Sequence, residues 1–234
     1  MGVNEIKDIG VDKKVISKEE HVPPSSEDNL CRILTGISYE EDPEGVINKM
    51  ISDRNEIYKK YGIPLSGEYK DSREYAKVLL DMAKNSDIPV SLVDPIALKK
   101  HGVGAGITQQ GKIVASTIDL NSCTDIEAYN WAVKFGHELI HAVQQKHDPS
   151  IPIEQAEYEA YILTYLPTAY DNSVKDYPGM ETVQYYMVDS YMFEKIKGSC
   201  LGYYEKNGIT QDKIPWVVSN KIESKNVVEL IDDR

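Results

Sequence analysis

The sequence has few of the features that mark secreted or membrane-bound proteins. It contains three cysteines in 234 residues, Cys31, Cys123 and Cys200, which lie far apart and form no Cys-x-x-Cys pair. Such cysteines make no disulfide framework and are typical of a reducing compartment. Residues 1–20 lack the apolar core of a signal peptide, and no apolar run is long enough to span a bilayer. We therefore predict a cytoplasmic protein with no membrane partner.

Positive charge is also scarce. The chain has 26 Lys and Arg residues against 38 Asp and Glu residues, for a formal net charge of -12 at pH 7. A nucleic-acid backbone needs clustered Lys and Arg, so a nucleic-acid partner is not expected. Binding to an anionic lipid surface is disfavoured for the same reason. The oligomeric state is left open.

The distribution of residue types predicts one domain between two tails. Residues 1–41 are charged and poor in aromatics, with "HVPPSSEDN" in the middle, and this composition predicts a flexible N-terminal tail. Residues 42–220 are long enough for one sizeable domain. Residues 221–234 form an acidic C-terminal tail. No internal repeat of useful length is present.

Periodicity and capping signals within the domain predict mostly helices. Asp42 with Pro43 can begin one helix, and Thr124 with Glu127 forms a capping box ahead of another. The predicted helices are 42–62, 71–86, 94–102, 124–147, 153–166 and 181–204, with Pro167 ending the fifth. Strands are predicted at 88–93 and, around a turn at Gln110–Gly111, within 102–120. The fold class is therefore α+β, helix-dominated, with a small sheet preceding helix 124–147.

One short motif within helix 124–147 predicts a metal site. "HELIH" places His137 and His141 four residues apart, so both imidazoles lie on one face of the helix. Two neutral histidines, a carboxylate and one open position make a catalytic zinc site. Glu138 is about 100° round the helix and is placed to act on a water molecule in the open position. The pattern therefore predicts a Zn2+-dependent hydrolase.

The third ligand has two candidate sources, and the first is His147. Its spacing after His141 matches the metzincin signature, in which a glycine turns the chain back towards the metal. Gln144 stands at the glycine position, and Gln144, Gln145 and Lys146 are good helix formers. If the helix continues, His147 lies about 120° off the line of His141 and about 9 Å further along the axis. We therefore expect His147 not to bind the metal.

The second source is the helix that follows, which offers Glu154, Glu157 and Glu159. Glu154 falls well off the apolar face of this helix. Glu157 and Glu159 flank that face about equally, so periodicity does not choose between them.

A family resemblance favours Glu157. "HELIHAVQ" followed by "EYEAYIL" resembles the compact gluzincins, especially the ImmA/IrrE-like metallopeptidases, and "HELIHAVQQ" is similar to peptidase domains of bacterial polymorphic toxins. The resemblance covers roughly residues 102–167 and implies a zincin-like domain. It implies that Glu157 is the third zinc ligand and that Ala160 is the small residue that lets two helices pack closely. Tyr161 stands where that family often has Asp or Asn.

The sequence therefore predicts a zinc metallopeptidase of gluzincin type that acts on a protein or peptide substrate. His137, His141 and Glu157 are the predicted metal ligands, and Glu138 is the predicted general base and acid. An oxyanion donor is expected among the sixteen tyrosines, but none can be assigned. Two alternatives are a metzincin-like peptidase that uses His147, and a non-catalytic zincin-fold module with a binding or regulatory role.

Overall fold

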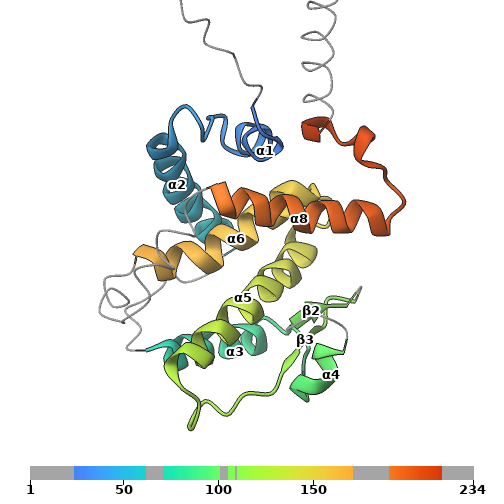
Figure 1. Ribbon diagram of the computed structural model, residues 1–234. Helices are drawn as coiled ribbons and strands as arrows, with labels where there is room; N and C mark the ends of the chain where they lie inside the picture. Colours follow the sequence, from blue (N-terminus) through green and yellow to red (C-terminus); the bar gives the residue numbers. More distant parts are fainter. Residues whose placement is uncertain (1–23, 62–70, 101–104, 109, 171–189, 218–234) are drawn as a thin grey trace, which may run out of the picture.

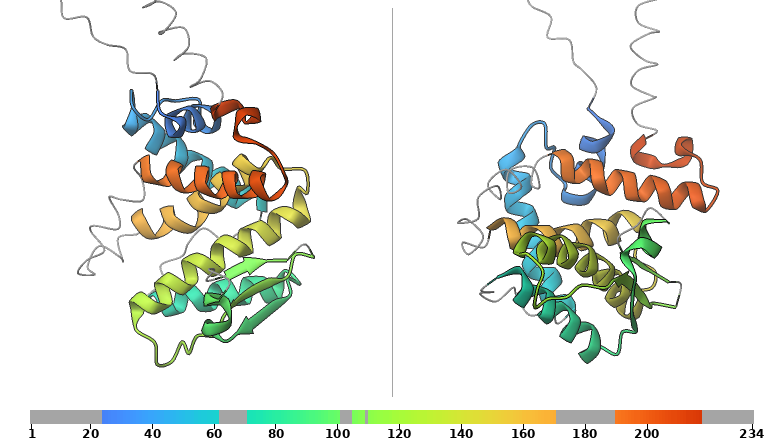
Figure 2. Two further views of the ribbon diagram at one scale, coloured as in Figure 1. Left: turned by 45° about the vertical axis from the view of Figure 1, so that its right-hand side comes forward. Right: turned by 60° about the horizontal axis from the view of Figure 1, so that its bottom comes forward.

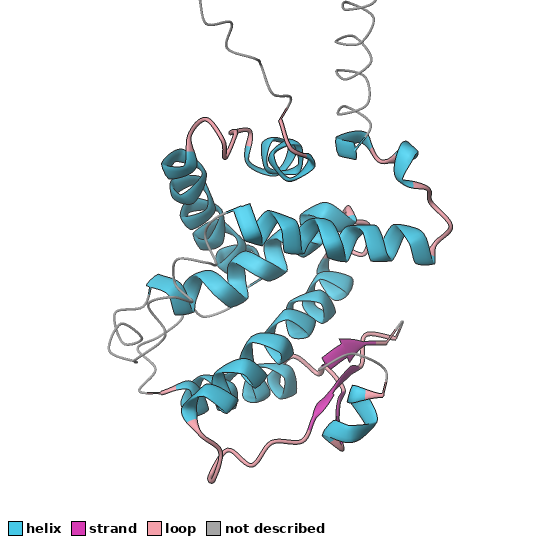
Figure 3. Cartoon of the chain, viewed as in Figure 1, coloured by secondary structure: helices cyan, strands magenta, loops and turns pink. Residues whose placement is uncertain are grey.

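Helices make up most of the computed structural model, and one small sheet lies beside them (Figure 3). The structure describes residues 24–61, 71–100, 105–108, 110–170 and 190–217. The three strands precede the long helix that carries the His-Glu-x-x-His motif. The prediction of a helix-dominated α+β fold with a small sheet ahead of this helix is confirmed.

The sheet has the strand order β1-β3-β2. Strand β1 (Val90–Val93) runs parallel to β3 (Ile113–Ser116), while β2 (Ala105–Ile107) is antiparallel to β3. The predicted turn between β2 and β3 is confirmed, and Gly111 has a φ of 73°, which glycine adopts without strain. Helix α4 (Pro95–Lys99) lies between β1 and β2 in the chain and is capped by the Asp94 side chain. In the strand order β1-β3-β2, β3 is the central strand of this sheet and β1 and β2 are its edge strands.

Helix α5 (Asp125–His147) runs through the middle of the molecule. It begins at the predicted capping box, in which Thr124 and Glu127 each bind the backbone of the other. Helix α3 (Ser72–Asn85) and the sheet pack on one side of α5, and the next helix, α6, packs on the other (Figures 1 and 2). Most of α5 is consequently buried on two sides, which explains its long apolar run.

Helix α6 (Ile153–Tyr170) extends past the predicted stop at Pro167. Proline lacks the backbone N–H that would bond to the carbonyl four residues earlier, which is that of Leu163. In the structure the hydroxyl of Tyr58 donates to the Leu163 carbonyl oxygen at 3.4 Å. This tertiary contact compensates the orphaned carbonyl, so the prediction that the helix ends before Pro167 is wrong.

Two helices cover the face of α6 that is turned away from the sheet. Helix α2 (Pro43–Tyr61) has its predicted start, with the Asp42 carboxylate accepting from the Gly45 amide at 2.9 Å. Helix α8 (Ser190–Lys206) packs on α6 and continues into a short 3-10 helix, η2 (Gln211–Lys213). None of the helices in the described ranges is long and apolar enough to cross a membrane.

The folded part begins before Asp42, which corrects the predicted N-terminal tail. Helix α1 (Ser26–Thr35) buries Leu30 and Cys31 in the core and packs against α8. Residues 1–23 of the predicted tail, the predicted tail at 221–234 and the first part of the predicted helix 181–204 lie outside the described residues.

A buried carboxylate joins α1 to the loop before α2. Asp28 accepts hydrogen bonds from Arg32 Nε at 2.7 Å, from Ser38 Oγ at 2.9 Å and from the Glu40 amide at 3.1 Å. Burial alone would raise the pKa of Asp28, but these donors outweigh it and hold the pKa below its usual value. The charged carboxylate is therefore part of the native packing of the N-terminal segment.

Replacing this carboxylate should destabilise the fold. We expect Asp28→Ala to lower the free energy of unfolding by roughly 2–4 kcal/mol, because it leaves several donors without an acceptor. Glu41→Ala removes the other carboxylate bound to Arg32, but the Glu41 side chain is 70% exposed, and the expected loss is below about 1 kcal/mol. Chemical denaturation measures both values. Equal losses in the two variants would contradict this role of Asp28.

Candidate metal centre

Helix α5 places two imidazoles one turn apart on the face that is turned towards α6. The Nε2 atoms of His137 and His141 are 3.1 Å apart, and the ring planes are perpendicular. Both side chains are only about one-sixth exposed. The spacing of four residues in the motif therefore brings the two rings together as the sequence predicts.

Helix α6 supplies a carboxylate to the same point. Glu157 Oε2 lies 3.3 Å from His137 Nε2, and Glu157 Oε1 lies 3.4 Å from His141 Nε2. The two helices approach closely beside these residues. A Cβ atom added at Gly136 would lie only 3.1 Å from the Thr164 side chain of α6, which is tighter than an ordinary contact. A glycine just before His137 thus allows the approach that brings Glu157 within reach.

The His–His–Glu cluster, which consists of His137, His141 and Glu157, fits a tetrahedral metal ion. Its ligand atoms all lie within 4.8 Å of one another. An ion held about 2.0–2.1 Å from each tetrahedral ligand, as Zn2+ is, keeps neighbouring ligand atoms about 3.3 Å apart. The two Nε2 atoms are 3.1 Å apart, and each lies 3.3–3.4 Å from a different oxygen of the Glu157 carboxylate, so these separations are close to that value. Glu157 Oε2 is also buried and makes no hydrogen bond to any described residue, so a cation would satisfy it.

The two histidines keep the Glu157 carboxylate in its charged form. Burial alone would raise the pKa of Glu157, but its contacts with the two imidazoles lower it to about 2. Burial alone would lower the pKa of His141, but the adjacent Glu157 carboxylate more than offsets this and raises it above the usual value. The pair therefore attracts positive charge, whether protons or a metal ion.

Glu138 lies beside the cluster in a different environment. Its pKa is raised, mainly by burial and also by the charge of Glu157, although the two histidines lower it in part. A carboxylate whose pKa is raised towards neutrality is a better general base than an ordinary one. The raised pKa of Glu138 thus suits proton transfer.

The structure gives the other candidate ligands, His147, Glu154 and Glu159, contacts outside the cluster. Helix α5 continues to His147, whose ring packs against the ring of Tyr61, with 6.0 Å between centroids. Glu154 accepts hydrogen bonds from Tyr204 and Trp216. Glu159 accepts from Tyr61, Lys60, Gln155 and Gln144. Of the three carboxylates that the sequence offers on α6, only Glu157 is directed at the histidines.

Two residues, Gln144 and Tyr161, contact the histidines of the cluster, and neither contact is predicted from the sequence. Gln144 binds His141 Nδ1 through its side-chain oxygen at 2.8 Å. In the sequence, the only sign of this contact is that a polar residue, Gln144, stands among the apolar positions of the helix. The ring of Tyr161, one turn after Glu157, packs edge-on against that of His137, with 4.7 Å between centroids. With sixteen tyrosines in the chain, no pattern distinguishes Tyr161 from the others.

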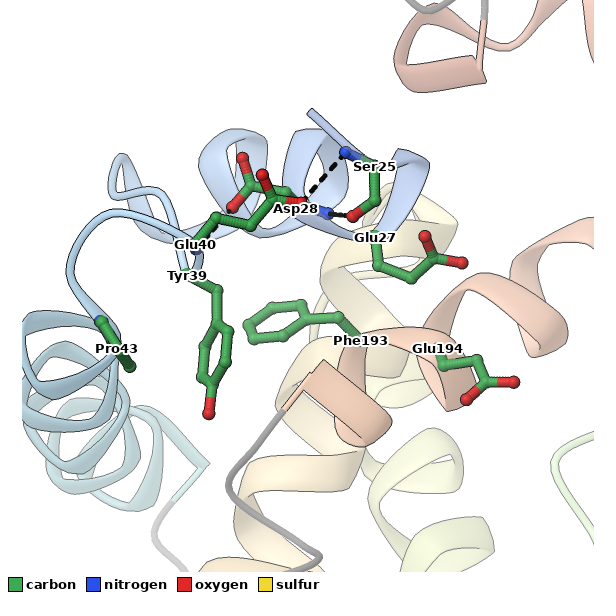
Figure 4. Close-up of a pocket in the computed structure, with 8 residues that line it drawn as sticks. All are labelled: Ser25, Glu27, Asp28, Tyr39, Glu40, Pro43, Phe193 and Glu194. Carbon is green, nitrogen blue, oxygen red and sulfur yellow. Dashed lines mark hydrogen bonds between the residues drawn. The ribbon is translucent and has the colours of Figure 1, made fainter. Parts of the chain in front are cut away.

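A pocket elsewhere in the molecule shares no residue with the cluster (Figure 4). It has a volume of about 620 Å³ and is lined by carboxylates such as Glu27 and Asp28 and by the rings of Tyr39 and Phe193. Asp28 is already bound by Arg32 and Ser38, and Glu27 is paired with Lys197. These carboxylates hold α1 in place, so we assign the pocket no ligand.

Comparison with known proteins identifies no relative of the chain. It has no significant match to any protein-family model, any curated protein or any solved structure. The function is therefore inferred from the chemistry and the geometry of the His–His–Glu cluster and from Glu138.

Proposed function

We propose that the protein is a zinc-dependent metallopeptidase in which His137, His141 and Glu157 bind the ion. The observation that carries this proposal is that the two imidazole Nε2 atoms lie 3.1 Å apart and that each lies 3.3–3.4 Å from one oxygen of the Glu157 carboxylate. Two histidines and one carboxylate leave a fourth tetrahedral position for water or substrate, which is the arrangement of catalytic rather than structural zinc sites.

Glu138 is the proton-transfer group in this proposal. Zinc bound at the cluster would supply Lewis acidity, which lowers the pKa of a water molecule and polarises a carbonyl group. The Glu138 carboxylate takes the proton from the attacking water and donates it to the departing amine. Burial raises the pKa of Glu138, so the carboxylate accepts a proton more readily than an exposed one. A site with only a structural purpose has no use for a carboxylate at this position.

The edge of the sheet supports a peptide as the substrate. Strand β2 pairs with β3 on one side and packs against α5, and its other side pairs with no strand in the described part of the chain. An extended peptide can add to such an edge through main-chain hydrogen bonds. Strand β3 cannot play this part, because it has neighbours on both sides.

The alternatives receive less support. The metzincin-like hypothesis needs the chain to turn back after His141, whereas α5 runs straight to His147. The non-catalytic hypothesis leaves the position and the raised pKa of Glu138 without a purpose. A cytoplasmic location remains part of the proposal and agrees with the three free cysteines.

Substitution of the ligands tests the metal site. We expect His141→Ala and Glu157→Gln to lose most of the bound zinc, because each removes one of three ligands. The matched controls are His147→Ala and Glu154→Gln, which make the same changes on residues outside the cluster and should retain stoichiometric zinc. Metal analysis of the purified proteins measures the difference. Full zinc in Glu157→Gln together with loss in His147→Ala would reverse the ligand assignment.

The affinity for zinc should fall as the pH is lowered. Both imidazoles must be neutral to bind a metal, so protons compete with zinc. The pKa of His141 is raised above the usual histidine value, which is about 6.5. We therefore expect affinity to fall as the pH is lowered, and the fall to begin above about pH 6.5. Chelator competition between about pH 6 and about pH 8 measures it; an affinity that is constant over this range would contradict the assignment.

Substitution of Glu138 tests catalysis separately from binding. We expect Glu138→Gln to retain zinc and to lower the rate of peptide hydrolysis roughly 100- to 10,000-fold, because the amide cannot accept the proton. The rate is followed by mass spectrometry on a mixture of unstructured peptides, with Glu154→Gln as the control. Equal rates for wild type and Glu138→Gln would remove Glu138 from the mechanism.

A further inference from the structure

Gln144 connects a proposed metal ligand to the neighbouring helix. Its side chain is almost fully buried, with 1% of the residue exposed. Its oxygen lies 2.8 Å from His141 Nδ1, and its nitrogen lies 3.0 Å from the Ala156 carbonyl oxygen and 3.1 Å from Glu159 Oε2. The amide thus makes one hydrogen bond within α5 and two to α6.

The two contacts on α6 fix the orientation of the Gln144 amide. The Ala156 carbonyl oxygen and the Glu159 carboxylate oxygen are both acceptors, so the NH2 group must face them. If the amide were reversed, its oxygen would lie against two acceptors in a buried site, which is strongly unfavourable. The oxygen of Gln144 therefore faces His141.

The carboxylate of Glu159 is itself held by a second helix. Tyr61 and Lys60, at the end of α2, both donate to it, and so does Gln155 of α6. A fixed carboxylate cannot rotate away from Gln144 without losing these bonds. The orientation of the Gln144 amide is consequently determined by residues of α2 and α6 as well as by α5.

We infer that Gln144 is a positioning residue that sets the tautomer of His141 for metal binding. Its oxygen can only accept a hydrogen bond and lies 2.8 Å from Nδ1, whereas the competing acceptor, Glu157 Oε1, lies 3.4 Å from Nε2. The shorter contact places the proton of a neutral His141 ring on Nδ1. The lone pair is then on Nε2, the atom that faces Glu157 Oε1 and His137 Nε2. A histidine that binds a metal through one nitrogen commonly donates from the other to an acceptor that fixes its tautomer and its orientation. Gln144 is that acceptor.

The inference deepens the proposed function and rests on it for the identity of the metal. The tautomer itself can be measured without any metal, by two-dimensional NMR of the whole, metal-free protein with ¹⁵N-labelled histidine. The five histidines give few signals, and the spectrum of His141→Ala assigns those of His141. At a pH where the ring is neutral, we expect the proton of His141 on Nδ1. A ring protonated on Nε2 in the wild type would overturn the inference.

Two substitutions of Gln144 separate positioning from packing. Gln144→Met and Gln144→Glu both lose the two donations to α6, so thermal unfolding should show that both are destabilised. Gln144→Glu keeps an oxygen for the His141 Nδ1 proton, whereas Gln144→Met does not. We expect the Nδ1 tautomer to persist in Gln144→Glu and to be replaced by a mixture in Gln144→Met. An unchanged tautomer in a folded Gln144→Met protein would leave Gln144 with a packing role only.

The affinity for zinc provides the second measurement. Loss of a partner of this kind weakens metal binding roughly 10- to 100-fold, and we expect this change in Gln144→Met by chelator competition. The matched control is Gln145→Met, the same substitution at the adjacent exposed position, which should leave both tautomer and affinity unchanged. Equal affinities of Gln144→Met and wild type would refute the inference. Failure of wild type to bind zinc would instead refute the proposed function, while the NMR result would still decide the tautomer.

Discussion

The close contact between α5 and α6 is the constraint on which the rest of the site depends. Gly136 allows Thr164 to approach, and the Gln144 side chain crosses to the Ala156 carbonyl a few turns further along. Between these two points the histidines of α5 and Glu157 of α6 are held within 3.4 Å of one another. If α5 and α6 lay further apart, the side chains of His137, His141 and Glu157 could not reach the same ion. The helices packed around this pair (α3 and the sheet on α5, α2 and α8 on α6) keep the contact in place.

Three partly or fully buried carboxylates, Asp28, Glu157 and Glu138, differ in the balance between desolvation and favourable contacts. Asp28 and Glu157 are surrounded by donors or imidazoles, and their pKa values lie below the usual range in spite of burial. For Glu138 desolvation dominates, and its pKa is raised. Carboxylates of the first kind stabilise a particular packing or hold positive charge, while one of the second kind is suited to exchange a proton. Glu157 and Glu138, one of each kind, influence each other's charge at the candidate metal centre.

Most of the helices and strands could be predicted from the sequence, and so could the part of the site that lies in the His-Glu-x-x-His motif. Capping residues and periodicity predict α2, α3 and α5, because these signals are local. Helix α1 cannot be predicted in this way, because its segment is polar in composition and the burial of Leu30 and Cys31 depends on packing in the folded protein. Pro167 predicts a helix stop, and the sequence does not reveal the compensating hydroxyl of Tyr58 because it is more than a hundred residues away. Periodicity could not separate Glu157 from Glu159, since the distinction comes from the donors around Glu159 on α2 and α5. The role of Gln144 depends on the same contacts.

The origin of the ligands in two consecutive helices also bears on how the molecule folds. Only residues 148–152 separate α5 from α6, so the contacts that create the cluster are local in sequence. Local contacts lose little chain entropy when they form, and they form faster than contacts between distant segments. An ion that binds the cluster would add its binding free energy to the folding of this helical hairpin.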